Sequence, residues 1–327
     1  MHFIVIGVKP TGKVAPRFLE EAQKLGHFID FVVPGQLRIY ASNKRIRFKL
    51  SGLTYPIDHY DLIYTLSISD KRKKDWFLFL DYVRATYGIT VIYEKYADPY
   101  YKPFLTPTYD YVVQHQNKIP FPKTVVFFNQ KGAVFAAKKI GFPAILKINA
   151  PGMTRKGIGV RKVESLEQLK NLVLEYKPVA NRYVLREFIP NNGDIRVFTV
   201  GYKAIGAMYR RPKPGDFRSN ISQGGSGEPF DLKKHPQVQK IAEKLSKLMR
   251  AQVAGVDVIL HAKTGKPYVL EINHGPQFAG LEKYAKVNAA REIIKYWEKM
   301  RKKDKLQLPI YRLKRKIYKL LGGNALW

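Results

Sequence analysis

Short apolar runs alternate with amphipathic stretches through the first third of the chain. Strands are predicted for four apolar runs, at residues 3–8, 29–33, 61–66 and 89–93, and helices for residues 15–25 and 76–86 between them. Strands that alternate with helices indicate a small parallel α/β unit. The basic segment 38–50 falls outside this alternation and predicts an added hairpin.

The pattern changes after this unit. The segment 96–108 is rich in Tyr and Pro and predicts a linker, and residues 109–117 predict a helix that follows it. A middle unit with two helices and several strands then extends to about Leu185, and a second sheet-bearing unit extends to about Met300. We therefore expect four parts: 1–117, an N-terminal α/β domain with its linker; 118–185; 186–300; and a basic tail, 301–327.

One predicted hairpin carries acidic residues. The β-rich runs 256–260 and 268–272 flank a turn at residues 263–266, and this arrangement can bring Asp257 next to Glu271. Since side chains alternate along a strand, Glu271 and Asn273 share one face. Two carboxylates and one amide suit Mg²⁺, which prefers a few carboxylates together with substrate phosphates. The alternative interpretation is two ordinary strand-end acids.

A group of arginines lies upstream of this hairpin. It comprises Asp194-Ile195-Arg196, the pair Arg210-Arg211, and the loop Arg218-Ser219-Asn220 ahead of Gly224-Gly225. Guanidinium groups match phosphate oxygens bidentately, and glycines let the backbone approach a ligand closely. Any one of these arginines alone is typical of a solvated surface charge in a chain this basic. Only their combination with the acidic hairpin favours a phosphate site.

A further segment has the composition of a nucleotide site. Residues 142–147 form an apolar run that ends in Lys147, and the glycine-containing segment 149–160 follows. A lysine on a strand beside such a loop can contact phosphates while the N–H groups of the loop fold over them. A glycine-rich loop by itself is weak evidence, because many turns have this composition.

The order of these motifs resembles the RimK-like branch of the ATP-grasp ligases, which includes alpha-L-glutamate ligases, over about residues 118 to 298. The matching motifs are the hinge Glu187-Phe188-Ile189, the strand 194–197, the loop 218–225, the D…E-x-N set and the segment 276–282. The resemblance implies an α/β protein with the ATP-grasp fold. Its small parallel α/β N-terminal unit would be followed by two α+β units that clamp the nucleotide.

The resemblance also implies an activity. It is that of an ATP-dependent carboxylate–amine ligase, which forms an amide through an acyl phosphate and adds glutamate or another amino acid to a peptide or small acceptor. The cofactors would be ATP and Mg²⁺, with Mn²⁺ as an alternative metal. The partners would be a carboxylate substrate and an amine acceptor, such as an acidic amino acid, a peptide or a carrier protein.

The same resemblance assigns residues to roles. The metal would be held by Asp257, Glu271 and Asn273. The nucleotide would be contacted by Lys147, by the backbone of Glu187 and Phe188, by Asp194, and by Arg218, Ser219 and Asn220, with residues 152–159 as a flap over the phosphates. Arg210 and Arg218 would stabilise the charge that develops during phosphoryl transfer. For the family's other ATP-contacting lysine the nearest candidate is Lys102.

Composition and charge limit the partners. Lys and Arg number 58 against 26 Asp and Glu, which gives a formal net charge of +32 over 327 residues. Such an excess attracts polyanions and acidic substrates. Since no nucleic-acid recognition motif is visible, an acidic protein or small acidic substrate is favoured over nucleic acid. The chain has no Cys, no apolar stretch that approaches 18 residues and no signal peptide pattern, so we expect a cytoplasmic protein without a transmembrane segment.

The tail has a pattern of its own. Apolar residues recur at helical spacing among basic ones: Ile310, Leu313, Ile317, Leu320 and Leu321. We expect this basic amphipathic helix to dock on the body of the same chain through its apolar face. The alternative is a helix that binds anionic lipid or a partner.

Three alternatives to the ligase remain open. The first is a basic interaction protein on a degenerate ATP-grasp body, which would bind ATP without turnover. The second is an RNA- or ribosome-associated ligase, with the tail as its tether. The third is a carboxylate kinase that uses no amine acceptor. The sequence identifies neither the acid nor the amine.

Overall fold

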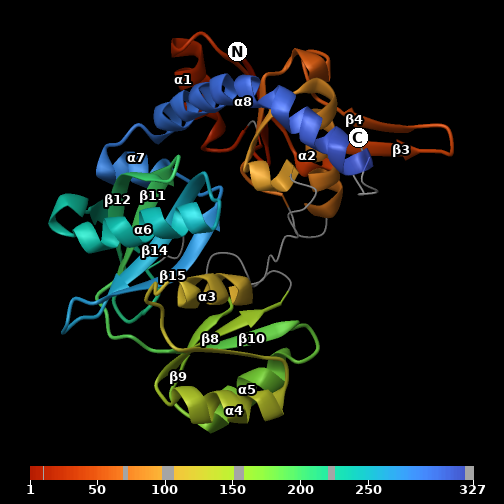
Figure 1. Ribbon diagram of the computed structural model, residues 1–327. Helices are drawn as coiled ribbons and strands as arrows, with labels where there is room; N and C mark the ends of the chain where they lie inside the picture. The colour runs from red at the N-terminus through yellow and green to blue at the C-terminus, as the bar shows by residue number, and fades with distance from the viewer. Residues whose placement is uncertain (10, 69–72, 98–106, 151–157, 220–224, 321–327) are drawn as a thin grey trace.

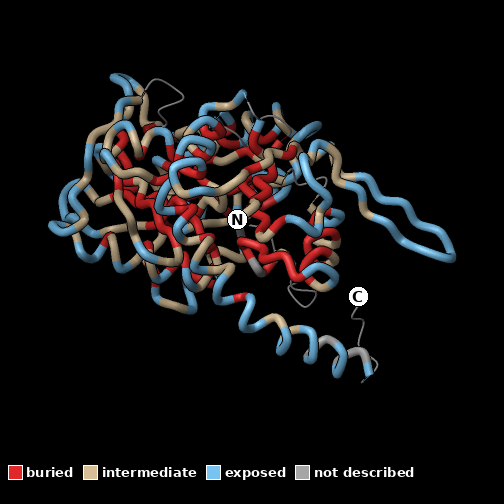
Figure 2. Tube along the Cα trace, turned by 90° about the horizontal axis from the view of Figure 1, so that it is seen from above, coloured by how far each residue is buried: buried red, intermediate tan, exposed pale blue. Residues whose placement is uncertain are grey.

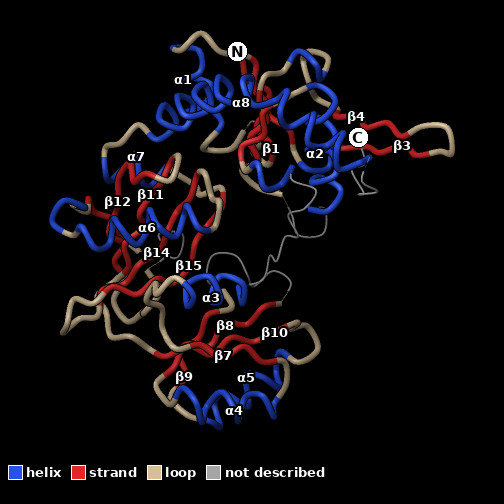
Figure 3. Tube along the Cα trace, viewed as in Figure 1, coloured by secondary structure: helices blue, strands red, loops and turns tan. Residues whose placement is uncertain are grey.

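The structure is a computed structural model that describes all residues except 10, 69–72, 98–106, 151–157, 220–224 and 321–327. Three units, each with its own main sheet, follow one another along the chain (Figure 1). The central unit lies at one end of the molecule, and the helix α8 (Ala289–Leu320) extends across the N-terminal unit at the other (Figure 3). Among the described helices, none is both long and apolar enough to cross a bilayer.

The N-terminal unit is the predicted parallel α/β unit. Its parallel sheet has the order β2-β1-β5-β6, formed by β1 (His2–Ile6), β2 (Phe28–Val32), β5 (Leu62–Thr65) and β6 (Thr90–Ile92). Its helices are α1 (Ala15–Lys24), α2 (Lys73–Tyr87) and the short 3-10 turns η1 (Pro34–Gln36), η2 (Ile57–His59) and η4 (Glu94–Ala97). One face of the sheet packs on α1 and α8 and the other on α2, so its strands are apolar on both faces.

The predicted hairpin of this unit is also present. The strands β3 (Leu37–Ala41) and β4 (Ile46–Leu50) pair only with each other and project from the body as an exposed ribbon (Figure 2). Phe48 fixes the base of the ribbon, because its ring packs on Phe79 and Tyr82 of α2. Residues 98–106 of the predicted linker lie outside the described residues. The helix α3 (Pro107–Gln116) begins two residues before the predicted start.

The central unit is an antiparallel sheet with two helices on one face. The sheet has the order β7-β10-β8-β9, formed by β7 (Thr124–Phe127), β8 (Ala144–Asn149), β9 (Val160–Val163) and β10 (Arg182–Glu187), with α4 (Gln130–Ile140) and α5 (Leu166–Tyr176). Each helix begins at a side-chain cap, Asn129 for α4 and Ser165 for α5. Because burial alternates along β8, Leu146 and Ile148 enter the core and Lys147 lies on the opposite face.

The C-terminal unit carries the predicted acidic hairpin. Its antiparallel sheet has the order β13-β12-β11-β14-β15, formed by β11 (Asp194–Val200), β12 (Lys203–Arg211), β13 (Ser226–Pro229), β14 (Val253–Leu260) and β15 (Pro267–His274). The remaining elements are η6 (Leu232–Lys234), α6 (Pro236–Leu248) and α7 (Ala279–Ala285). Helix α6 covers the face that carries Val197 and Val256, so the alternate residues Arg196 and Asp257 lie on the face away from α6.

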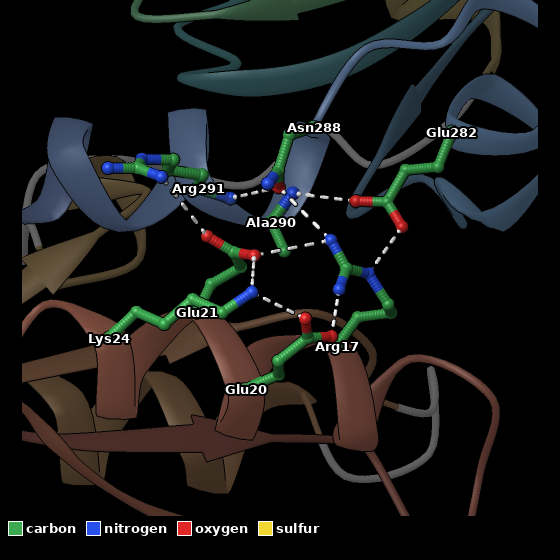
Figure 4. A network of polar contacts seen from close by, with 8 residues as sticks. All are labelled: Arg17, Glu20, Glu21, Lys24, Glu282, Asn288, Ala290 and Arg291. Atoms are coloured by element: carbon green, nitrogen blue, oxygen red, sulfur yellow. Dashed lines mark hydrogen bonds and ion pairs between the residues drawn. The ribbon is translucent and has the colours of Figure 1, made fainter.

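The first and last helices fasten the N-terminal unit to the C-terminal unit. In the network of Figure 4, Arg17 of α1 donates from Nε to Glu282 Oε2 of α7 at 2.8 Å and from Nη2 to Asn288 Oδ1 at 3.3 Å. Beside this network, the ring of Phe18 packs on Phe278 and Trp297, with centroids 5.1 and 5.2 Å apart. The two units therefore share one apolar core.

The boundaries expected at residues 185 and 300 fall inside regular elements. β10 runs to Glu187, and α8 continues to Leu320 without a break at residue 300. The division of the chain into four parts stays a prediction.

The tail docks on the body of its own chain, as predicted, but the prediction that it docks through its apolar face is wrong. Helix α8 packs on α2 through Asp304, which binds Arg84 at 2.8 Å, and through the hydroxyl of Tyr311, which donates to Asp81. Leu313 and Ile317, which were expected to dock, are 57% and 48% exposed. The buried ion pair and hydrogen bond select the opposite face of the helix. Leu321 lies outside the described residues.

Candidate functional site

The hairpin β14–β15 brings the three predicted metal ligands together. Asp257 pairs with Glu271 across the two strands, and Asn273 lies two residues further along the same face. The amide nitrogen of Asn273 lies 3.4 Å from Asp257 Oδ2 and 3.2 Å from Glu271 Oε1. The turn is closed by Gly265, whose φ of +64° suits glycine. The predicted hairpin and the proximity of these side chains are confirmed.

Asp257 is held by two arginines from the neighbouring strands. Arg196 of β11, directly opposite in the sheet, donates from Nε to Oδ1 at 2.7 Å and from Nη2 to Oδ2 at 2.6 Å. Arg210 of β12 lies 3.1 Å from Oδ1. Burial opposes ionisation of Asp257, but the two guanidinium groups outweigh it and hold the pKa of this carboxyl below its usual range. Asp257 is therefore a fixed, buried carboxylate.

Asp194 and Arg210 form a second buried ion pair, and Arg210 links it to Asp257, so that alternating charges form a row across the sheet that we call the buried ladder. The guanidinium of Arg210 donates to both carboxylate oxygens of Asp194, from Nε at 2.5 Å and from Nη2 at 2.7 Å. Both residues are less than a tenth exposed. Asp194 was expected to orient the nucleotide and Arg210 to stabilise developing charge. In this structure the two side chains are paired with each other. Either residue would therefore affect a nucleotide indirectly, by holding Asp257 and its neighbours in place.

Lys147 joins the central unit to this cluster. Its ammonium lies 3.4 Å from Glu271 Oε2, across the gap between the sheets of the two units. The positive charge of Lys147 is the main reason why the pKa of Glu271 is lowered. Glu271 is 46% exposed, so its carboxylate remains open to a ligand. The structure thus places the predicted phosphate-contacting lysine beside the predicted metal ligands.

The predicted adenine hinge lies at the end of β10. The backbone N–H of Glu187 donates to the carbonyl of Lys123 at 2.9 Å, and the Glu187 carboxylate accepts from the N–H of Lys123 at 3.1 Å. The N–H of Glu187 is therefore used inside the central unit. Phe188 carries the ammonium of Lys162 over its ring, 4.8 Å from the centroid.

The predicted phosphate loop after β12 is described only in part. Arg218 binds Asp216, with Nη2 at 2.9 Å from Oδ2 and Nε at 3.0 Å from Oδ1, and these hydrogen bonds lower the pKa of Asp216 to about 2. The guanidinium of Arg218 is thus paired with a carboxylate of its own loop. Ser219 is buried. Asn220, Lys102 and most of the predicted flap 152–159 lie outside the described residues.

The side chains of Asp257, Glu271 and Asn273 are of the kinds that bind a magnesium ion. In the described part of the chain there is no group of three or more His, Cys, Asp or Glu residues placed to hold a metal, and the present set has two carboxylates and one amide. Mg²⁺ accepts such a set when substrate phosphates complete its shell. Oδ1 of Asp257 already receives two guanidinium contacts, whereas Oδ2 receives one short contact and the longer one from Asn273. Oδ2, whose second contact is the longer one, is thus the less strongly bound of the two oxygens and the better placed to accept a cation.

Two parts of the site were missed by sequence reasoning. Arg196 received no role, although its period-two spacing from Asp194 placed both on one face of a predicted strand. The second part is a buried lysine behind the hairpin: Lys95 is 1% exposed and donates to the carbonyl of Met249 at 2.7 Å, with His274 Nε2 at 3.2 Å. Nothing in the sequence pattern indicated that contact.

Lys95 predicts a pH-dependent stability. Burial lowers its pKa to about 7 from the usual 10.5. Below about pH 7, Lys95 is protonated in both the folded and the unfolded chain, so it does not make stability depend on pH there. Above that pH the folded chain loses a proton that the unfolded chain keeps, so stability should rise with pH, by about 2 kcal/mol between pH 7 and about pH 9. Urea unfolding of wild type and Lys95→Met across this range measures the difference. Parallel curves for the two proteins would contradict the assignment.

The comparisons with known proteins agree with this geometry. The RimK-like ATP-grasp domain family matches residues 111–297, more than half of the chain. A relative from Shewanella amazonensis named probable alpha-L-glutamate ligase 2 is 36% identical over 162 residues, which cover 49% of this chain and 52% of the relative. One from Legionella pneumophila named probable alpha-L-glutamate ligase is 35% identical over 164 residues. The chain thus spans about half the length of the curated relatives it matches.

A solved structure extends the likeness to the N-terminal unit. The macrocyclase MdnC of Microcystis aeruginosa, solved with its precursor peptide MdnA, aligns over 90% of this chain and 98% of its own with a TM-score of 0.65 at 15% identity. The ATP-grasp ligase PsnB aligns over 91% of this chain and 97% of its own with a TM-score of 0.64 at 16% identity. At these identities the likeness shows the fold alone, which is the ATP-grasp fold of PsnB. The resemblance seen in the sequence is confirmed, and the chain belongs to the RimK-like ATP-grasp family.

Proposed function

We propose that this chain is an ATP-dependent carboxylate–amine ligase that forms an amide bond through an acyl phosphate. The observation that carries the proposal is the cluster in which Lys147 of the central sheet meets Glu271 of the C-terminal sheet, beside Asp257 and Asn273. A cation and two carboxylates between two sheets are the groups that a nucleotide with its metal requires.

The residues of the cluster have distinct tasks in this proposal. Asp257, Glu271 and Asn273 would hold Mg²⁺, which when bound would neutralise charge on the phosphates. Lys147 would bind a phosphate oxygen and release Glu271 from its present contact. Arg196 and Arg210 keep Asp257 ionised and fixed in place. This is preorganisation, because the carboxylate need not reorient when charge develops.

The phosphate loop and the hinge complete the proposed nucleotide site. Arg218 and Ser219, with Asn220, would face the phosphates from the loop after β12. Glu187 and Phe188 would line the adenine, with the carbonyl of Glu187 and the backbone of Phe188 as the polar contacts. Mg²⁺ is the preferred metal, with Mn²⁺ as an alternative of similar ligand preference.

The carboxylate substrate that we favour is acidic. The names of the relatives, probable alpha-L-glutamate ligases, support glutamate as the added amino acid, and the structural neighbour MdnC carries a peptide. The net charge of +32 would draw an acidic peptide or carrier protein to the chain. We therefore propose an acidic peptide or protein as the carboxylate substrate.

ADP release measured with a panel of amino acids and acidic peptides tests the proposal. A ligase should release ADP only when ATP, a carboxylate and an amine are all present. ADP release with the carboxylate alone would indicate a carboxylate kinase. ATP binding without ADP release under any combination would indicate a degenerate body. The latter has one structural observation in its favour, since Asp257 is already bound by two arginines.

A further inference from the structure

The distal part of α8 carries an exposed apolar row that the ligase function does not use. Its members, which we call the α8 seam, are Leu306, Ile310, Leu313, Ile317 and Leu320. Their exposed fractions range from 48% to 85%. In Figure 2 this part of the helix lies at the edge of the molecule and is coloured mostly as exposed. An apolar row this exposed indicates a surface that binds something.

The seam lies opposite the face by which the helix is docked. Leu308 packs over Gly88, while Asp304 and Tyr311 make polar contacts with α2. At 100° per residue these three positions cluster on one side of the helix, and the seam clusters about 180° away. The seam therefore points outward from the body. A second helix could therefore pack along the seam without meeting the body of the first chain, which lies on the opposite side of α8.

The spacing of the seam is that of a coiled coil. Successive members are four, three, four and three residues apart, which is the alternation of the a and d positions in a heptad. Ile310 and Ile317 then occupy a, and Leu306, Leu313 and Leu320 occupy d. Ile at a with Leu at d favours two parallel strands. A strict a/d row is also narrower than the apolar face with which a helix lies on a bilayer.

We propose that the α8 seam binds the α8 seam of a second copy of this chain, as a parallel two-stranded coiled coil. In that register each g position faces the e position of the next heptad in the partner. Lys302 at g then faces Gln307, and the next g position is Pro309, which has no charge. Neither of these two contacts puts two lysines together. The a position one heptad before Ile310 is Lys303, which lies just outside the seam and would face its own copy, so charge repulsion weakens this end of the pair.

The size of the seam sets the expected affinity. A Leu or Ile that becomes fully buried hides on the order of 100 Å², so five from each copy hide roughly 1,000 Å². That area lies at the lower limit for a specific interface, and the general charge of the chain opposes association. We therefore expect a dimer with a dissociation constant of about 1–100 µM that tightens when salt screens the repulsion.

Sedimentation equilibrium tests the association. Wild type should dimerise, and Ile310→Gln/Ile317→Gln should weaken the dimer by about 100-fold or more, because two buried a positions become polar. Both side chains are exposed in the single chain, and Gln is a good helix former, so the variant should fold. Lys305→Gln, an exposed position of the same helix outside the seam, is the matched control and should dimerise as wild type does. A wild type that stays monomeric at about 300 µM and high salt overturns the proposal.

Cysteine cross-linking tests the orientation, because the natural chain has no Cys. Leu306→Cys and Leu320→Cys should each form a disulfide-linked homodimer, since d positions meet their own copies in a parallel pair. Lys305→Cys should not. Cross-linking only when the two variants are mixed would show an antiparallel pair and overturn the parallel assignment. Binding of monomeric wild type to anionic vesicles or to an acidic helical peptide, in place of self-association, would overturn the second copy as the occupant.

Discussion

Glu271→Gln is expected to lower turnover by about a thousand-fold or more, with little change in the free energy of unfolding. The substitution keeps the shape of the side chain but removes one of the two carboxylates that would hold Mg²⁺, and with it the ion pair with Lys147. Loss of a charged ligand at a phosphoryl-transfer centre removes transition-state stabilisation. Stability should survive because Glu271 is nearly half exposed. Steady-state ADP release at saturating ATP measures the effect.

Glu228→Gln is the matched control. Glu228 lies on the edge strand β13 of the same sheet and binds Arg211 at 2.6 Å on the surface. It should retain turnover within a few-fold of wild type. Wild-type turnover in Glu271→Gln would refute the site. Loss of turnover in both variants would show that the sheet tolerates no change of charge, and the role of Glu271 would then be unsupported.

Arg210→Met is expected to lower the free energy of unfolding by about 3–5 kcal/mol. The substitution removes the positive charge that balances the buried carboxylate of Asp194 and part of that which balances Asp257. Arg210 binds both oxygens of Asp194 and also lies 3.1 Å from Asp257. Met keeps much of the volume of the side chain, so the effect is mainly electrostatic. Urea unfolding at neutral pH measures it.

Two controls isolate the charge effect. Arg211→Met removes the next residue, which lies exposed on the sheet, and should change stability little. Asp194→Asn/Arg210→Met removes one buried acid together with its partner and should be more stable than Arg210→Met alone. A double variant that is as unstable as Arg210→Met would mean that packing, and not uncompensated charge, accounts for the loss.

The sequence predicted elements wherever the signal was local. The turn around Gly265 and the alternation of apolar and polar residues predicted the hairpin that pairs Asp257 with Glu271, and the structure has that pairing. The strands and helices of the N-terminal unit were predicted for the same reason. Helix starts are less well marked: α3 begins at Pro107, two residues before the predicted start, since proline fits the first turn of a helix.

Contacts between distant parts of the chain were beyond that reasoning. The pairing of Arg196 with Asp257 depends on the register of β11 against β14, which no local pattern specifies. The burial of Lys95 depends on how η4 packs behind the hairpin. The tail shows the same limit, because its apolar row predicted a docked face while Asp304 and Tyr311 form the contacts with α2.

The sequence by itself therefore determined the family, the order of the three sheet-bearing units and the residue types of the candidate site, because motifs and periodicity are properties of neighbouring residues. Only the tertiary structure decided that Lys147 reaches Glu271, that two arginines bind Asp257, and which face of α8 remains exposed. These are decided by the packing of one sheet or helix against another. Burial makes such contacts strong, and it is a property of the whole fold.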